Sequence, residues 1–191
     1  MNENLKVISY KGIRELIEDT PKLRTRAMLA VQYGLGARAG ELIKYTHTDS
    51  RETIGLLKSN IELLNDVWVC SIPNFKNAKQ EFKKPYISPV EEFVYEPFRE
   101  WLDVCGEQVF KLRISRYRQL ISEALPEGLA SHCLRHSRAS HLADVFKFNA
   151  YEIKAFLGHA RLDTSAIYVS QDLSRSKDKI ESQLRSVKKG E

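Results

Sequence analysis

A short segment of the chain, Ser131 to His141, holds three histidines and two arginines. His132 and Arg135 are three residues apart, so on a helix they share one face. Imidazole and guanidinium N–H groups on one face suit an anion such as a phosphate. A metal site at His132 and His136 would need a carboxylate at ligand spacing, and the arginines would repel the cation. We therefore expect an anion-binding face here, with neither a metal nor a cofactor.

Three further places could add groups to such a site. Arg38 stands between small residues at an expected helix start, with Glu41 one turn further on. Gly158 is typical of a helix end, and it would present His159 from the following turn. Tyr168 follows nine residues later in an apolar run. Taken alone, Arg38 and Glu41 would be a surface ion pair of little worth, and Tyr168 a core residue.

Composition narrows the class of protein. The chain has 191 residues, 42% of them hydrophobic, which is enough for one domain with its own core. Its net charge of +5 slightly favours binding to polyanions. No apolar stretch is long enough for a membrane span and no signal peptide is evident. Three widely spaced cysteines argue against a disulfide framework and favour the cytoplasm.

The elements that must position these groups are mostly helices. Residues 66–88 read as a β-hairpin with a charged tip, because two runs rich in β-formers flank a polar turn. Thr20 and Pro21 are expected to cap and start the second helix. The predicted fold class is mainly α with a small antiparallel β-hairpin or sheet (α+β). Helices are expected at 11–18, 22–33, 39–45, 90–103, 113–124, 134–145, 150–157, 163–168 and 173–186.

The order and spacing of these pieces resemble the tyrosine recombinase family of phage and plasmid integrases and chromosome-dimer resolvases. The family's small residue followed by Arg-x-x-Glu-Leu matches residues 38–42. Its His-x-Leu-Arg-His core matches residues 132–136. Its Leu-Gly-His motif, with a tyrosine nine residues beyond the histidine, matches 157–159 and Tyr168. The resemblance runs from about residue 10 to 186, and the combination is far more specific than any single part.

The resemblance implies a tyrosine recombinase catalytic-domain fold and a DNA strand transferase. Tyr168 would attack a phosphodiester to give a 3′-phosphotyrosine, which conserves the bond energy, so neither ATP nor metal is required. Arg38 and Arg135 would clamp the two non-bridging oxygens, where charge develops in the transition state. His132 and His159 would add hydrogen bonds to the phosphate or help move the nucleophile's proton.

The leaving 5′-oxygen also needs a proton, and in the family a lysine on a β-hairpin supplies it. Lys76, at the end of the outgoing strand, best matches that position, with Lys79 as runner-up and Lys83 and Lys84 on the return strand. For at least two of these four lysines we expect a solvated turn and no catalytic role. By resemblance Glu41 buttresses the site.

Residues 1–172 are expected to be the catalytic domain and 173–191 a C-terminal helix or tail that docks on a neighbouring protomer. The partners implied are double-stranded DNA and a tetramer assembled on it, with no membrane. Family members usually carry an N-terminal DNA-gripping domain, and only about ten residues precede the pattern here, so we expect an isolated catalytic domain, a cut piece or a minimal enzyme. Arg113 and Arg116 share a helix face that would meet backbone phosphates or only solvent.

Two rival functions stay open at this point. Type IB topoisomerases use the same residues to nick and reseal one strand, and a DNA-binding module built on the fold would have no chemistry. The compact size and the Leu-Gly-His form favour a recombinase over the first, and the presence of every expected catalytic position argues against the second.

Overall fold

The computed structural model describes residues 6–46, 52–73 and 82–158 of the chain. The hairpin tip with Lys76 and Lys79, the motif residues His159 and Tyr168, and the helices expected after residue 158 lie outside the described residues. The same is true of the tail 173–191, so its docking stays a prediction.

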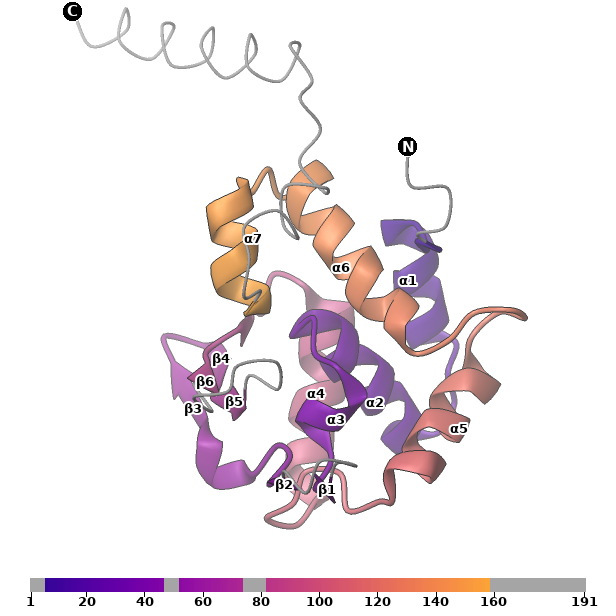
Figure 1. The fold of residues 1–191 in the computed structure, drawn as a ribbon, viewed down its shortest axis with the longest axis vertical. Coiled ribbons are helices and arrows are strands. Elements are labelled where there is room, and N and C mark those ends of the chain that lie inside the picture. Colours follow the sequence, from indigo (N-terminus) through magenta and orange to yellow (C-terminus); the bar gives the residue numbers. More distant parts are fainter. Residues whose placement is uncertain (1–5, 47–51, 74–81, 159–191) are drawn as a thin grey trace, which may run out of the picture.

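Five helices form the body of the fold (Figure 1). The helix α2 lies among them, packed against the other four, and nearly all of its residues from Ala27 to Gly34 are fully buried. From Ala27 on, this helix is buried on all of its faces, which places it in the middle of the domain. The five are α1 (Tyr10–Glu18), α2 (Leu23–Gly34), α4 (Glu92–Val104), α5 (Ile114–Ala124) and α6 (His132–Asp144).

In the part of the chain that the structure describes, two shorter α-helices and one 3₁₀ turn, η1 (Lys58–Asn60), complete the helical part. The four-residue helix α3 (Ala39–Leu42) follows α2 after a tight turn, and α7 (Ala150–Leu157) packs against α6. In the described ranges, no helix is both long and apolar enough to cross a membrane.

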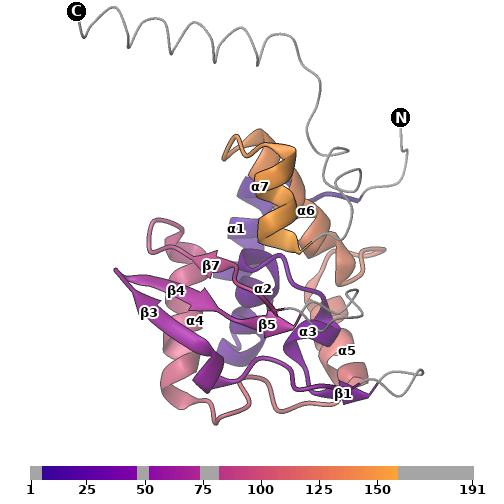
Figure 2. The same cartoon turned by 60° about the vertical axis from the view of Figure 1, so that its left-hand side comes forward.

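A small antiparallel sheet lies on the side of the helices away from α5 (Figure 2). Its strand order is β3 (Ile61–Leu64), β4 (Val67–Cys70), β7 (Tyr86–Ile87), with Trp68 opposite Ile87. The pairing continues in β5 (Ile72–Pro73) and β6 (Phe82–Lys83), where Ile72 faces Lys83. The predicted hairpin is therefore confirmed, broken at Ser71 into two ladders.

The second half of this hairpin, residues 82–87, alternates between exposed and buried side chains and buries a lysine. Residues 83, 85 and 87 are buried, while 82, 84 and 86 are exposed. Because side chains alternate between the two faces of a strand, this register puts Lys83 inside and Phe82 outside. A buried ammonium needs partners, and the site described below provides them.

Most helices lie within about two residues of their predicted bounds, and three expectations were wrong. The helix expected at 39–45 ends at Leu42, because β1 (Tyr45–Thr46) pairs with β2 (Glu52–Thr53). Thr20 does not cap α2, because α2 begins only at Leu23. The Thr20 hydroxyl instead donates to Leu16 O at 2.7 Å, at the end of α1.

The third error was an omission, since no strand was predicted before residue 66. The strand β3 pairs with β4 through a two-residue turn, Asn65-Asp66, in which both residues have positive φ (48° and 64°). Asn and Asp tolerate this conformation better than other side chains, and it is the one that two-residue hairpin turns require. That turn signal between two runs of β-formers could have revealed β3.

Candidate active site

The first arginine of the motif is held by its own helix. Arg38 lies just before α3, and its backbone N–H donates to Glu41 Oε2 at 2.8 Å. Its guanidinium Nη1 donates to the other oxygen, Oε1, also at 2.8 Å. The Glu41 side chain is 0% exposed and that of Arg38 is 19% exposed. The interpretation of this pair as a surface ion pair was therefore wrong, because the carboxylate is a buried support for the arginine.

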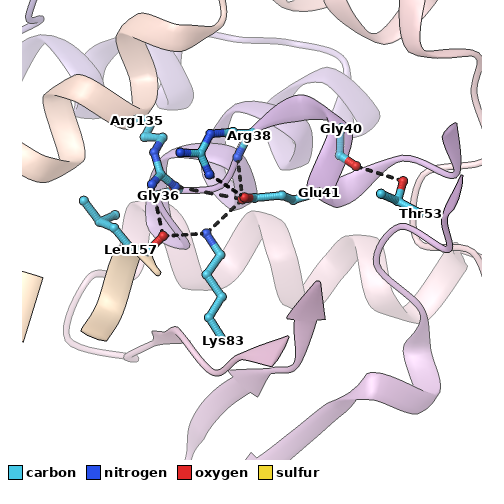
Figure 3. Close-up of polar contacts among 8 residues, drawn as sticks. All are labelled: Gly36, Arg38, Gly40, Glu41, Thr53, Lys83, Arg135 and Leu157. Carbon is cyan, nitrogen blue, oxygen red and sulfur yellow. Dashed lines mark hydrogen bonds and ion pairs between the residues drawn. The ribbon is translucent and has the colours of Figure 1, made fainter. Parts of the chain in front are cut away.

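The second arginine reaches the same place from α6. Arg135 Nη1 donates to Gly36 O at 2.5 Å, and Nη2 donates to Leu157 O at 3.0 Å. Its Nη1 also lies 3.9 Å from Glu41 Oε2. Figure 3 shows the two guanidiniums on the same side of Glu41. The structure thus brings together Arg38 and Arg135, as the motif required.

The turn between α2 and α3 is shaped for this approach. Gly36 has a φ of +56°, a conformation that L side chains rarely adopt. A Cβ at Gly36 would also come within 2.2 Å of Leu157 Cδ2. Glycine is therefore needed for the turn and for the close approach of α7, and that approach puts Gly36 O and Leu157 O where Arg135 can bind both.

Lys83 is the third cation of the cluster, and no motif assigned it a role beyond its place among the hairpin lysines. Its ammonium lies 2.8 Å from Glu41 Oε2 and donates to Leu157 O at 3.1 Å. Its side chain is 3% exposed. The alternation of buried and exposed residues along the return strand was the signal that could have identified it.

Electrostatics keep Glu41 ionised. Burial alone would raise the pKa of Glu41, but Lys83 and then the two arginines outweigh it and lower the pKa to about 2. Burial lowers the pKa of Lys83 to about 8, against the opposing pull of Glu41. Near neutrality, three cations therefore surround one carboxylate, and the cluster carries a net positive charge. Such a cluster is built to receive an anion.

Two histidines of α6 lie near the arginines. His132 is the first residue of α6 and is exposed, whereas His136 is half-buried. Burial lowers the pKa of His136, and His132, Arg135 and Arg38 lower it further. The His136 imidazole is therefore within electrostatic reach of both guanidiniums, and His132 and Arg135 come from one turn of α6.

Arg138, the second arginine of α6, has a structural role in the core. Its Nη1 donates to both oxygens of Glu91, at 2.7 and 2.8 Å, and its side chain is 4% exposed. The guanidinium carbon also lies 5.1 Å from the ring centroid of Tyr33. This arginine joins α6 to the start of α4 inside the core and makes no contact with Glu41 among those described.

Of the six predicted site residues, Arg38, His132 and Arg135 are described: the two arginines meet at Glu41, and His132 lies one turn before Arg135 on α6. Lys76, His159 and Tyr168 are outside the described residues, and their roles remain predictions. Gly158 closes α7 in the left-handed conformation (φ 66°, ψ 44°), so the helix end expected just before His159 is confirmed.

The comparisons with known proteins agree with this geometry. The pattern of the phage integrase family matches residues 6–175. The chain belongs to that family. It is 28% identical over 176 residues to the tyrosine recombinase XerC of Chlorobaculum parvum, covering 87% of this chain and 51% of XerC. It is 30% identical over 182 residues to XerC of Rickettsia canadensis, covering 91% and 56%. The chain thus spans about half the length of the curated relatives it matches.

Solved structures of this integrase family share the fold. The XerH recombinase bound to its difH substrate gives a TM-score of 0.68 at 19% identity, covering 92% of this chain and 53% of XerH. The catalytic domain of bacteriophage HP1 integrase gives 0.56 at 18% identity, covering 92% of this chain and 95% of that domain. The fold is therefore the α+β fold of tyrosine recombinase catalytic domains, as predicted.

Proposed function

We propose that this chain is the catalytic domain of a site-specific DNA recombinase, of the integrase or resolvase type, with Tyr168 as its nucleophile. The observation that carries the proposal is the pair Arg38 and Arg135, gathered around the buried carboxylate of Glu41 in a cluster of net positive charge. Family membership and the XerC relatives favour a recombinase over a topoisomerase or a DNA-binding module without chemistry.

In the proposed reaction, a DNA phosphodiester binds between the two guanidiniums. Attack by the Tyr168 oxygen on phosphorus breaks the bond to the 5′-oxygen, which leaves as a free 5′-hydroxyl after taking a proton. The transition state spreads charge over the non-bridging oxygens, and fixed guanidinium donors stabilise it. Losing one such donor typically lowers the rate by about 10²–10³-fold.

The remaining roles follow the motif. We assign the proton for the 5′-oxygen to Lys76 and the further phosphate contacts to His132 and His159. A 5′-hydroxyl of a second duplex then attacks the phosphotyrosine, which restores a phosphodiester without ATP or metal. Exchange between duplexes needs several active sites, so we propose that the protein assembles as a tetramer on double-stranded DNA, with residues 173–191 docking on a neighbour. The three free cysteines, Cys70, Cys105 and Cys133, support a reducing compartment, the cytoplasm.

A covalent-adduct experiment tests the nucleophile. A nicked suicide duplex, which loses a short fragment on cleavage, should trap the protein as an adduct that survives denaturant. The adduct should vanish in Tyr168→Phe and persist in the control Tyr151→Phe, a tyrosine on α7 that is 71% exposed. An adduct that persists in Tyr168→Phe would assign the nucleophile elsewhere. No adduct from the unmodified chain, at high protein concentration and low salt, would reject the proposed function.

A further inference from the structure

Lys83 is a buried ammonium that the proposed reaction does not use. Lysine is among the residues least often buried, because removing its charge from water is costly unless the charge is paired. Its two described polar contacts are Glu41 Oε2 at 2.8 Å and Leu157 O at 3.1 Å. Those contacts join the hairpin strand β6 to α3 and to the end of α7.

At Glu41, Lys83 makes the close contact and Arg135 stays farther away. The Oε2 atom of Glu41 accepts from the Arg38 backbone and contacts the Lys83 ammonium, both at 2.8 Å, whereas Arg135 Nη1 stays 3.9 Å away. Without the ammonium, Glu41 would be short of one close cation. Attraction across 3.9 Å in a buried setting is strong enough to draw a guanidinium into direct contact.

At Leu157, Lys83 and Arg135 share one acceptor. Both donate to the carbonyl of Leu157, at 3.1 and 3.0 Å (Figure 3). This carbonyl is one of the last of α7, where cations are favourable because the helix dipole leaves negative charge there. It also directly precedes Gly158, so the contact fixes the position from which the chain leads to His159.

We propose that Lys83 is a positioning residue: it is the counter-ion of Glu41 that leaves Arg135 in place for the scissile phosphate, and it pins the Leu157 carbonyl at the end of α7. The inference rests on the proposed function. Lys83 is distinct from the general acid, because its ammonium is directed at Glu41 and Leu157 and its side chain is 3% exposed.

Single-turnover cleavage at saturating DNA tests the proposal. Lys83→Met should slow cleavage by about 10²-fold, the size expected when a catalytic group is displaced by about 1 Å. DNA affinity should change little, because the guanidiniums of Arg38 and Arg135 remain. The matched control is Lys84→Met, since Lys84 is the next residue and is exposed. Cleavage by Lys83→Met within twofold of the unmodified rate would overturn the proposal.

The cleavage rates of charge-changing variants distinguish a counter-ion from a lysine that only supports the fold. Lys83→Met leaves one cation fewer around Glu41, and adding Glu41→Gln restores the net charge of the cluster. Lys83→Met should therefore slow cleavage by a smaller factor in a Glu41→Gln background than in the unmodified chain, a comparison that cancels the loss of the Glu41 support for Arg38. An equal or larger factor in the Glu41→Gln background would show that the counter-ion role is wrong.

A substrate with sulfur in place of the bridging 5′-oxygen separates positioning from proton donation, because a thiolate leaves without a proton. It should restore cleavage in Lys76→Ala and leave Lys83→Met slow. Restoration in Lys83→Met would make Lys83 the general acid and overturn the proposal.

Hydrogen exchange tests the anchoring without any chemistry. The last turn of α7 should exchange its amides faster in Lys83→Met than in the unmodified chain or in Lys84→Met, with the other helices unchanged. Unchanged exchange there would refute the pinning of Leu157. This result stands even if the unmodified chain forms no DNA adduct, so a failure of the proposed function is recognised separately.

Discussion

At the residue scale, one carboxylate organises the site. Glu41 meets Arg38 from its own turn, Lys83 from the hairpin and Arg135 from α6. Removing one partner from such a buried group typically costs more than the pair contributes, because the remaining charge is left without compensation. We therefore expect the loss of any one of these charges to destabilise the cluster.

The acid stability of the fold should depend on Glu41. Its pKa is lowered from 4.5 to about 2 in the folded chain. A carboxyl whose folded pKa is depressed stabilises the fold above its unfolded pKa, and this stabilisation is lost as the pH falls from about 4.5 toward 2. Glu41→Gln should thus lower the free energy of unfolding much more at pH 7 than at pH 3. Urea titrations measure this, with the exposed Glu62→Gln as control; a gap independent of pH would contradict it.

The general acid is a second residue-scale prediction. Lys76→Ala should abolish cleavage while DNA binding, measured by mobility shift, survives, because only the proton for the leaving oxygen is lost. Lys79→Ala is the matched control, because Lys79 is the runner-up lysine three residues further along the sequence. Full cleavage by Lys76→Ala together with loss in Lys79→Ala would transfer the role to Lys79.

Some residues of the site could be predicted from the sequence and others could not. Arg38, His132 and Arg135 were predicted because a motif marks them, and the structure brings the two arginines together at Glu41. Lys83 carries no motif, and its burial depends on the register of a hairpin that spacing alone does not fix. Apart from the motif, nothing in the sequence separates Arg135 from Arg138. The structure separates them by their partners, which are Glu41 and two carbonyls for Arg135 and Glu91 for Arg138.

At the element scale, the site depends on close approach between the α2–α3 turn and the end of α7. Periodicity predicted both helices that flank this contact. It could not predict the four-residue length of α3, because the strand pairing after Leu42 ends the helix. Tertiary pairing of this kind commonly overrides local helix propensity.

Gly36→Ala should damage this contact. The new Cβ would meet Leu157 at 2.2 Å, and the residue would keep a φ of +56°. The left-handed conformation alone costs roughly 1–2 kcal/mol for a residue with a Cβ. We expect a loss of at least about that much stability in thermal or urea unfolding. Gly106→Ala is the control, because its Cβ would meet nothing within 4 Å. Equal stability of the two variants would show that the turn relaxes freely.

At the scale of the whole molecule, a net charge of +5 is modest for a protein proposed to act on DNA, so the placement of charge matters more than its sum. Arg113 and Arg116 are exposed at the start of α5, and Arg116 has a long ion pair of 3.9 Å to Glu123. Such an exposed pair contributes little to stability, and both guanidiniums can reach outward.

If these arginines contact backbone phosphates, Arg113→Ala with Arg116→Ala should flatten the salt dependence of DNA binding. Each lost contact reduces the slope of log K against log salt by about 0.9. Fluorescence anisotropy at several salt concentrations measures the slope. Arg99→Ala, an exposed arginine paired with Glu96, serves as the control. An unchanged slope in the double variant would leave α5 as a solvated helix face.

The hydrogen bond from Arg135 to Gly36 O spans 99 residues of sequence. The anion site therefore cannot exist until α6 has been synthesised and has folded back onto the turn after α2. A nascent or truncated chain that stops before that point has Arg38 and Glu41 but no second guanidinium. On the proposed function, ribosome-bound fragments of this protein are harmless to the genome, and the ability to cut DNA arises only when folding is complete.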